Sequence, residues 1–496
     1  MRNTENIIQD DNMKNVMVIY PPGGSYQRGE DRCQININAS VSNALRACND
    51  LGYIAAGLKG KYNVFLKDYP AENLHFSDMT KDISDFNPDF VFISTTNASI
   101  FEDISVIKHI KEIKNDVHVI LKGAVFFNPD PDIFEEADFS QIDFLVGGES
   151  EFIVPVLIDR FYNGGNYSDI EGICYKDNNK WKVNKVITLN EDLDSLPFPD
   201  RSLMKNELYI NPDTNRPLAT ISVSRGCPSS CIYCLSPVIS GRKVRFRSME
   251  SVFEEISECF NKYGIKDFFF KADTFTMDKT RVVKLCDLIL NSPLKGKINW
   301  VANSRVNTID EEMLIKMKEA GCSLIAFGLE SGSDESLKLM KKGTTVQQNE
   351  AAVKLVKKHG LKVFGFYLVG FPWETKEHLK MTEKLMFKLN TDFIELSVAT
   401  PFKGSQLYSM LFNELDGGKK VLGKDSFKYM TLGTKYLTKK DLDDFRRKVL
   451  LKYHLRPSYI LKKIFNKNLT PALLFNYITY GFRLIKNNII RKRYID

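Results

Sequence analysis

Three of the nine cysteines in this 496-residue chain lie within eight residues, in the stretch "CPSSCIYC". Cys227, Cys231 and Cys234 have the spacing C-x3-C-x2-C, and Gly226 and Pro228 favour a loop at this point. Three thiolates on one short loop can bind three corners of a cubic iron–sulfur cluster. The chain supplies no fourth thiolate nearby, so one metal position is left for an outside ligand.

Two other uses of these thiols stay open. A structural zinc site needs a fourth Cys or His, and the nearest downstream histidine is His359. A redox dithiol needs only Cys231 and Cys234 and gives the third cysteine no role. The other six cysteines show no paired spacing: Cys33, Cys48, Cys174, Cys259, Cys286 and Cys322. Without a secretory signal, we expect them to be buried free thiols of a protein in the reducing cytoplasm.

The cysteine loop directly follows the first of about six strand–helix repeats. Short apolar runs predict the strands "LATISVSRG", "DFFFKAD", "INWVANSR", "SLIAFGLES", "KVFGFYLVGFP" and "FIELSVATP". Amphipathic segments such as residues 310–321 predict the helices between them. We therefore expect a partial (β/α)6 TIM-type barrel over residues 215–408, with an active site at the carboxyl ends of its strands.

The first third of the chain also alternates apolar runs with amphipathic segments. Five runs from "NVMVIY" to "DFLVGG" predict a Rossmann-like, doubly wound parallel sheet over residues 1–167. Ligands bind at the carboxyl ends of such strands. Small and polar residues stand there: Gly23, Ser94, Thr95, Thr96, Asn97, Gly123, Gly147, Gly148 and Glu149. The glycines either admit a large flat or phosphate-bearing ligand or merely turn the chain.

Residues 168–214 are expected to form a linker with a hairpin, and residues 409–496 a basic, mainly helical region. The formal charge is only +7, and much of the excess lies in this last region, so a nucleic-acid partner is not expected. The run "PALLFNYITYGF" is too short to span a bilayer.

The end of the chain combines apolar with basic residues. The apolar residues are Leu473, Phe475, Tyr477, Ile478, Phe482, Ile485 and Ile489, and the basic ones are Arg483, Lys486, Arg491, Lys492 and Arg493. This pattern is typical of a helix that packs across the barrel mouth or the first domain, or of one that lies peripherally on an anionic membrane. The membrane interpretation would favour a lipid or isoprenoid substrate.

The segment "SRGCPSSCIYC", with Tyr233 before the third cysteine, resembles the cluster loop of radical S-adenosyl-L-methionine (SAM) enzymes. The resemblance implies a [4Fe–4S] cluster whose open iron binds SAM. It also implies reductive cleavage of SAM to a 5′-deoxyadenosyl radical, with electrons from a reductase such as flavodoxin or ferredoxin. Positions similar to those around SAM in this family are Tyr233, Asp273, Arg305, Glu330, Val369 and Gly370.

This family often has two acidic residues where the present chain has Ala272 and Asp273, so the match at this position is partial. A different interpretation makes Asp273, Arg305 and Glu330 partners in salt bridges at the barrel mouth.

A doubly wound domain joined to such a barrel by "LDSLPFPDR" resembles the cobalamin-binding branch of the radical SAM enzymes. The segment "DFLVGGESE" is similar to the part of that branch that approaches the corrin, and the resemblance covers roughly residues 14–460. None of His75, His109 and His118 lies in a D-x-H-x-x-G motif, which implies cobalamin without a histidine ligand. A dinucleotide is disfavoured, because the glycines in "YPPGGSYQRGED" do not fit G-x-G-x-x-G.

The resemblance implies a cobalamin-dependent C-methyltransferase that acts on an unactivated carbon of a small-molecule substrate. A cyclisation or rearrangement without methylation is the first alternative. A tRNA methylthiotransferase is more remote, since it would need three further cysteines in the first domain, where the chain has only Cys33 and Cys48. An electron-transfer or cobalamin-carrier protein would not need the three charged residues expected near SAM.

Overall fold

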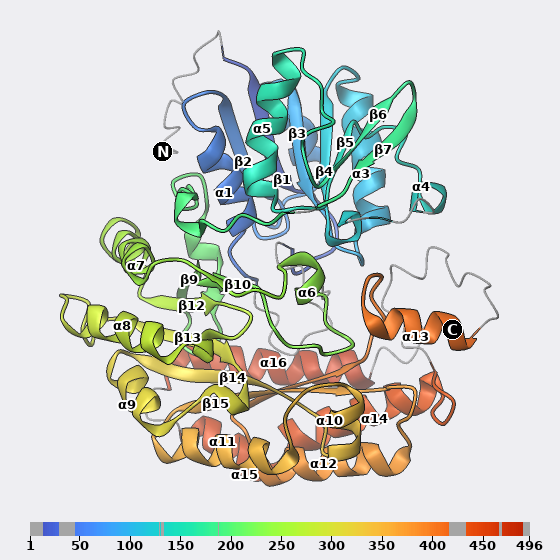
Figure 1. Cartoon of the computed structure of the whole chain (residues 1–496). Helices are drawn as coiled ribbons and strands as arrows, with labels where there is room; N and C mark the ends of the chain where they lie inside the picture. Colours follow the sequence, from blue (N-terminus) through green and yellow to red (C-terminus); the bar gives the residue numbers. More distant parts are fainter. Residues whose placement is uncertain are drawn as a thin grey trace. The chain divides into compact units, whose positions relative to one another are not determined.

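The structure, a computed structural model, describes residues 13–28, 45–127, 129, 133–186, 188–415, 433–465 and 469–489. Cys33 and the basic residues 491–493 lie outside these ranges. The chain divides into two compact units, whose main segments are Cys48–Leu208 and Tyr209–Val421. The described C-terminal helices belong to the second unit (Figure 1).

The first unit is built on a seven-stranded sheet with the order β2-β1-β3-β4-β5-β6-β7. Its first five strands are parallel: β1 Asn15–Tyr20, β2 Asn63–Asp68, β3 Phe90–Ser94, β4 His118–Lys122 and β5 Phe144–Val146. Helices α1 (Asn49–Leu58) and α5 (Ser150–Tyr162) contact each other on one face, and α2 (Phe76–Phe86) and α3 (Ile100–Ile113) pack on the other (Figure 1). Helices on both faces explain why the strands are continuous apolar runs. The expected Rossmann-like sheet is confirmed.

The hairpin that the sequence placed in the linker extends this sheet. Strand β6 (Ile173–Asp177) pairs antiparallel with β5 and with β7 (Lys180–Asn184). Asn178 and Asn179 at its turn both have positive φ, 50° and 60°, as a type I′ turn requires. The hairpin satisfies the backbone groups of the β5 edge, which would otherwise be unpaired.

The second unit has the sheet order β16-β15-β14-β13-β12-β9-β8. Six strands are parallel: β9 Arg216–Ser222, β12 Asp267–Lys271, β13 Asn299–Ser304, β14 Cys322–Glu330, β15 Lys362–Val369 and β16 Phe393–Val398. The short β8 (Ile210–Asn211) pairs antiparallel with β9. The helices between strands are α7 Met249–Tyr263, α8 Lys279–Leu290, α9 Glu311–Glu319, α11 Val346–Lys358 and α12 Lys376–Leu389. The expected partial barrel is confirmed.

The C-terminal region is helical, as expected: α13 Gln406–Leu415, α14 Lys439–His454, α15 Pro457–Ile464 and α16 Pro471–Ile489. The last two helices pack at the amino ends of barrel strands. Lys462 of α15 forms an ion pair of 2.6 Å with Asp392, directly before β16. Asn476 of α16 donates to Asn215, directly before β9, at 2.8 Å.

Neither α15 nor α16 therefore crosses the barrel mouth, which lies at the opposite, carboxyl ends of the strands. No helix in the described ranges is long and apolar enough to cross a membrane.

Candidate active site

The three cysteines lie on the loop between β10 (Ser224–Arg225) and α6 (Ser236–Ile239), just after the carboxyl end of β9. Gly226 begins the loop with φ +97°, and a Cβ there would lie 2.0 Å from the carbonyl oxygen of Lys243, so only glycine fits. Cys227 and Cys231 are buried and Cys234 is half-buried. The Cys234 N–H donates to the Cys231 carbonyl at 3.2 Å, which closes a tight turn between these two cysteines.

Two donors point at the sulfur atoms. The Ser236 N–H donates to Cys234 Sγ at 3.4 Å, and Arg305 Nη1 donates to Cys231 Sγ at 3.8 Å. Donors and positive charge near sulfur stabilise the thiolate, which is the form that ligates metal. This part of the barrel mouth therefore suits cysteines that act as ligands.

The arrangement fits a cluster better than a single ion. In the described part of the chain, no three His, Cys, Asp or Glu side chains are close enough together to hold one metal ion. Zinc would need its ligands within about 2.3 Å of one centre, whereas a cubic cluster spreads three thiolates over three irons. None of the eight described cysteines forms a disulfide. Burial raises the pKa of Cys174 and of Cys286 to about 12, as expected for inert core thiols.

Asp273, at the carboxyl end of β12, contacts both ends of the cysteine loop. Its carboxylate accepts a hydrogen bond from the Gly226 N–H at 2.8 Å and another from the Ser236 hydroxyl. The family resemblance placed Asp273 among the positions around SAM. In the structure two of its hydrogen-bonding positions tie down the loop, so Asp273 also has a positioning role.

Glu330 and Arg305 both contact Lys342, which lies near the cysteine loop. Glu330 forms a buried salt bridge of 2.7 Å with Lys342, and each of the two side chains is 7% exposed. Burial and the Glu330 carboxylate raise the pKa of Tyr233 well above its usual range. Arg305 donates to the Lys342 carbonyl. For Glu330, the salt-bridge interpretation of the sequence therefore holds.

The backbone of Glu330 has φ +57°, which is strained for a residue with a side chain. Such strain gathers at ligand sites, where the surrounding contacts maintain it. Here the salt bridge with Lys342 supplies such a contact at the end of β14.

The turn after β15 is held from inside by Glu374, which the sequence analysis did not identify. Its fully buried carboxylate accepts hydrogen bonds from the Gly370 N–H at 2.7 Å and the Phe371 N–H at 3.1 Å. Burial raises the pKa of Glu374. The Val369 side chain lies in the barrel core, which leaves its backbone as the part that can face a ligand.

In the first unit, the predicted residues lie along the carboxyl edge of the sheet. The order β2-β1-β3 places a topological switch point between β1 and β3, where doubly wound sheets bind ligands. Gly23 follows β1, and the polar run from Ser94 to Asn97 ends and follows β3. Gly123 follows β4, and Gly147, Gly148 and Glu149 follow β5.

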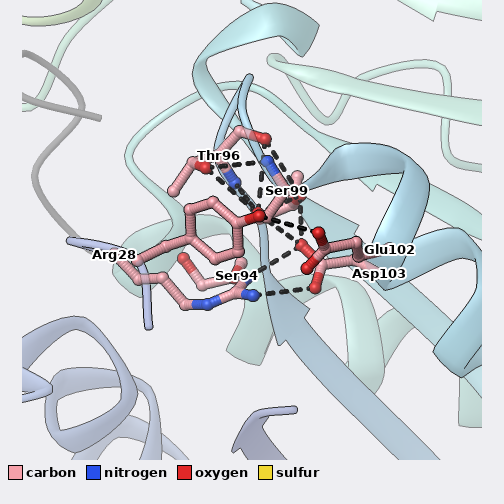
Figure 2. A network of polar contacts seen from close by, with 8 residues as sticks. Arg28, Ser94, Thr96, Ser99, Glu102 and Asp103 are labelled. Carbon is pink, nitrogen blue, oxygen red and sulfur yellow. Dashed lines mark hydrogen bonds and ion pairs between the residues drawn. The ribbon is translucent and has the colours of Figure 1, made fainter. Parts of the chain in front are cut away.

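A buried ion pair that the sequence analysis missed lies at this switch point (Figure 2). Arg28 donates two hydrogen bonds of 2.8 Å to the Asp103 carboxylate, and both side chains are 2% exposed. Asp103 also accepts from the Thr95 hydroxyl at 2.5 Å and the Ser99 hydroxyl at 2.7 Å, while Arg28 donates to the Ser94 carbonyl at 2.7 Å. The network ties the loop after β1 to the end of β3, and it turns the Thr95 hydroxyl towards Asp103.

Internal packing explains three of the glycines. A Cβ would lie 1.9 Å from the Phe126 carbonyl oxygen at Gly147, 2.4 Å from Ile153 at Gly148 and 2.8 Å from Thr95 at Gly123. Gly23 is different, because its φ is +139° and the nearest atom to a Cβ would be 3.7 Å away.

Two other residues of this edge differ in their hydrogen bonding. The Ser94 hydroxyl is buried without a hydrogen-bond partner among the described residues. A buried hydroxyl without a partner at the carboxyl edge of the sheet is compatible with a bound cofactor. The Glu149 carboxylate accepts from the Asn190 N–H at 3.0 Å.

One sequence signal could have revealed the ion pair. Asp103 lies on the buried face of α3 with Ile100, Ile104 and Ile107, and an acidic residue there needs a partner. Nothing in the sequence identified Arg28, 75 residues away, as that partner.

Residues 221–386 match the family model of the radical SAM superfamily. An uncharacterized methyltransferase of Pyrococcus horikoshii is 35% identical over 422 residues, which cover 84% of this chain and 89% of that protein. The anaerobic magnesium-protoporphyrin IX monomethyl ester cyclase of Rubrivivax gelatinosus is 27% identical over 386 residues, 77% of this chain and 67% of that protein.

Among solved structures, the cobalamin-dependent S-adenosylmethionine radical enzyme OxsB with aqua-cobalamin bound is similar with a TM-score of 0.71. The match covers 96% of this chain and 72% of OxsB, and at 17% identity it shows a shared fold. Together with the three-cysteine loop at the barrel mouth, these likenesses show that the chain belongs to the radical SAM enzymes, whose cofactors are a [4Fe–4S] cluster and SAM, and that it shares the fold of the cobalamin-dependent enzyme OxsB.

Proposed function

We propose that this protein transfers a methyl group to an unactivated carbon of a small-molecule substrate. The observation that carries the proposal is the loop with three thiols at the barrel mouth, in a chain 35% identical to a protein named a methyltransferase. When bound, the cluster, SAM and cobalamin supply the radical that removes a hydrogen atom and the methyl group that replaces it.

The residues of the loop have distinct proposed roles. Cys227, Cys231 and Cys234 ligate the cluster, and the N–H of Ser236 and the guanidinium of Arg305 stabilise the negative charge on their sulfur atoms. Asp273 holds the two ends of the loop. These contacts support a loop that keeps its three ligands oriented and leaves one iron free for SAM.

The other residues of the barrel mouth would surround SAM. The positions proposed for this role are Tyr233, Asp273, Arg305, Glu330, Val369 and Gly370. The buried pair of Glu330 and Lys342 supports a fixed polar wall beside Tyr233. Glu374 holds the backbone of Gly370 and thereby the turn that would face the nucleoside part of SAM.

The first unit would hold cobalamin at the carboxyl edge of its sheet. We propose Gly23, Ser94, Thr96 and Asn97 as contact residues, because Ser94 has an unpaired buried hydroxyl and Gly23 lies open. Thr95 has a positioning role, since its hydroxyl is engaged by Asp103. The smallness of Gly123, Gly147 and Gly148 serves the packing of the chain, so their backbone is the part available to a ligand.

A second candidate function is radical cyclisation or rearrangement without methylation, which the 27% identity to the cyclase of Rubrivivax gelatinosus supports. The products separate the two functions. The protein is incubated without oxygen with SAM, a small-molecule extract and a reductant. The reductant is either dithionite or reduced flavodoxin, which represents the proposed class of reductase. S-adenosylhomocysteine formed together with 5′-deoxyadenosine supports methyl transfer, whereas 5′-deoxyadenosine alone would overturn it. The Cys231→Ala variant should form neither product.

A further inference from the structure

Large apolar side chains gather in solvent on the last two helices of the second unit. The exposed residues are Ile460, Leu461, Ile464 and Phe465 on and just after α15, and Leu474, Phe475, Ile478 and Phe482 on α16. Phe465 is 77% exposed, and Phe475 and Phe482 are each 69% exposed. Elsewhere in the described ranges, the exposed large apolar residues are dispersed, with at most two on any one element, which is normal for protein surfaces. A gathered set indicates a contact surface.

Helix α16 is apolar on two opposite faces. Leu473 and Leu484 are 2% and 4% exposed and lie on the face that packs into the unit, where α16 contacts α14. Phe475, Ile478 and Phe482 follow a spacing of three and four residues, which places them together on the outer face. Packing among the described residues explains why the first face is apolar. It does not explain why the outer face is apolar.

Helix α15 lies next to α16 and exposes a similar set. The ammonium group of Lys463 on α15 lies 5.3 Å from the ring centre of Tyr477 on α16. Both helices contact the amino ends of barrel strands through Asp392 and Asn215. The apolar surface is therefore at the end of the barrel remote from the cysteine loop, and covering it leaves the barrel mouth free.

The chain segment that carries this surface is rich in basic residues. Residues 445–495 contain thirteen Lys and Arg and no Asp or Glu, whereas the whole chain has 69 Lys and Arg against 62 Asp and Glu. Lys452 and Lys462 form ion pairs with Glu383 and Asp392, and 64% and 52% of their side chains remain exposed. A second copy seated on the same surface would bring these basic groups against each other. An anionic lipid layer takes up both the apolar side chains and the positive charge.

We propose that α15 and α16 form a peripheral membrane-binding surface for anionic phospholipids. Phe465, Phe475 and Phe482 enter the boundary between headgroups and acyl chains, and the surrounding Lys and Arg contact lipid phosphates. The proposal does not depend on the reaction that the barrel catalyses.

The test is co-sedimentation of the full-length protein with vesicles. We expect binding to mixed phosphatidylglycerol and phosphatidylcholine vesicles, weaker binding to phosphatidylcholine alone, and loss of binding at high salt. The double variant Phe475→Asp/Phe482→Asp should bind the mixed vesicles roughly 100-fold more weakly, since each side chain contributes roughly tenfold. The matched control is Ile315→Asp on α9, which changes an isolated side chain of 42% exposure and should bind like the wild type.

A second measurement does not rely on a disruptive change. In the conservative variant Phe482→Trp, the indole emission should shift to shorter wavelength when mixed vesicles are added. Equal vesicle binding by the wild type and the double variant would overturn the proposal, as would an unchanged emission. A wild-type dimer in light scattering that the double variant abolishes would assign the surface to a second copy and overturn it as well.

Discussion

The buried ion pair between Arg28 and Asp103 gives a quantitative test of how the carboxyl edge of the first sheet is built. The variant Arg28→Met removes the guanidinium and retains an extended apolar side chain. It leaves the Asp103 carboxylate buried, with the hydroxyl groups of Thr95 and Ser99 as its remaining partners. It also removes the donor to the Ser94 carbonyl, so the loop after β1 loses its tie to β3.

The expected cost follows from the burial of the pair. Removing one partner of a buried ion pair costs about 3–5 kcal/mol, because the remaining charge is uncompensated. Two hydroxyl groups still donate to Asp103, so we expect a loss near the lower limit, about 3 kcal/mol. Because about 1.4 kcal/mol corresponds to a factor of ten, local opening should become roughly 100-fold more frequent.

Hydrogen exchange of the full-length protein, read by mass spectrometry, measures this effect locally. Peptides that cover β1 and β3 should exchange roughly 100-fold faster in Arg28→Met, while the barrel strands should be unchanged. The double variant Arg28→Met/Asp103→Leu should regain most of the protection, since both charges are gone.

A matched control is the exposed pair of Lys108 and Asp138, whose side chains are 50% and 52% exposed. The variant Asp138→Asn should cost less than about 1 kcal/mol. Two results would refute the reasoning. In the first, the exchange rates of β1 and β3 in Arg28→Met stay within about threefold of the wild type. In the second, the double variant exchanges as fast as the single variant.

Three further predictions concern the second unit. Asp273→Ala should lower the iron content after anaerobic reconstitution and broaden the electron paramagnetic resonance signal of the reduced cluster. Asp273→Asn can still accept a hydrogen bond from the Gly226 N–H and should retain most of the iron. Equal iron content in the wild type and both variants would count against the positioning role. Lys342→Met leaves the buried Glu330 carboxylate without its ion-pair partner and should lower the free energy of unfolding in urea by about 3 kcal/mol. An unchanged free energy of unfolding would show that this pair does not stabilise the barrel. Burial lowers the pKa of His454 to about 4, so the folded state resists protonation of this side chain. The free energy of unfolding should be highest above about pH 6.5 and fall by about 2 kcal/mol by pH 5. The variant His454→Gln should lack this loss.

The local features of this chain were predictable because their signals are local. The strands of both sheets are short apolar runs whose ends are marked by polar residues or glycine. The spacing of the three cysteines by itself indicates a cluster loop. Arg28 could not be found in the same way. Its partner lies 75 residues away, and only the order of the strands brings the two together.

The position of the last helices shows a second limit. The amphipathic pattern of α16 indicates that one face is buried, but it does not indicate against what. Asn476 finds its partner at Asn215, 261 residues earlier, and this contact places the helix at the amino ends of the strands. Likewise, the hairpin of β6 and β7 was predictable from its turn, whereas its addition to the β5 edge depends on which strand is left unpaired.

The central claim is that this chain holds a three-cysteine [4Fe–4S] cluster and cobalamin together. The most direct measurement counts iron and cobalt in the anaerobically purified full-length protein and in the variant Cys227→Ala/Cys231→Ala/Cys234→Ala. We predict about four iron atoms and about one cobalt atom per wild-type chain, and a variant that loses the iron but keeps the cobalt. Iron that persists in the triple variant, or a wild-type protein that binds iron but no cobalt, would contradict the claim.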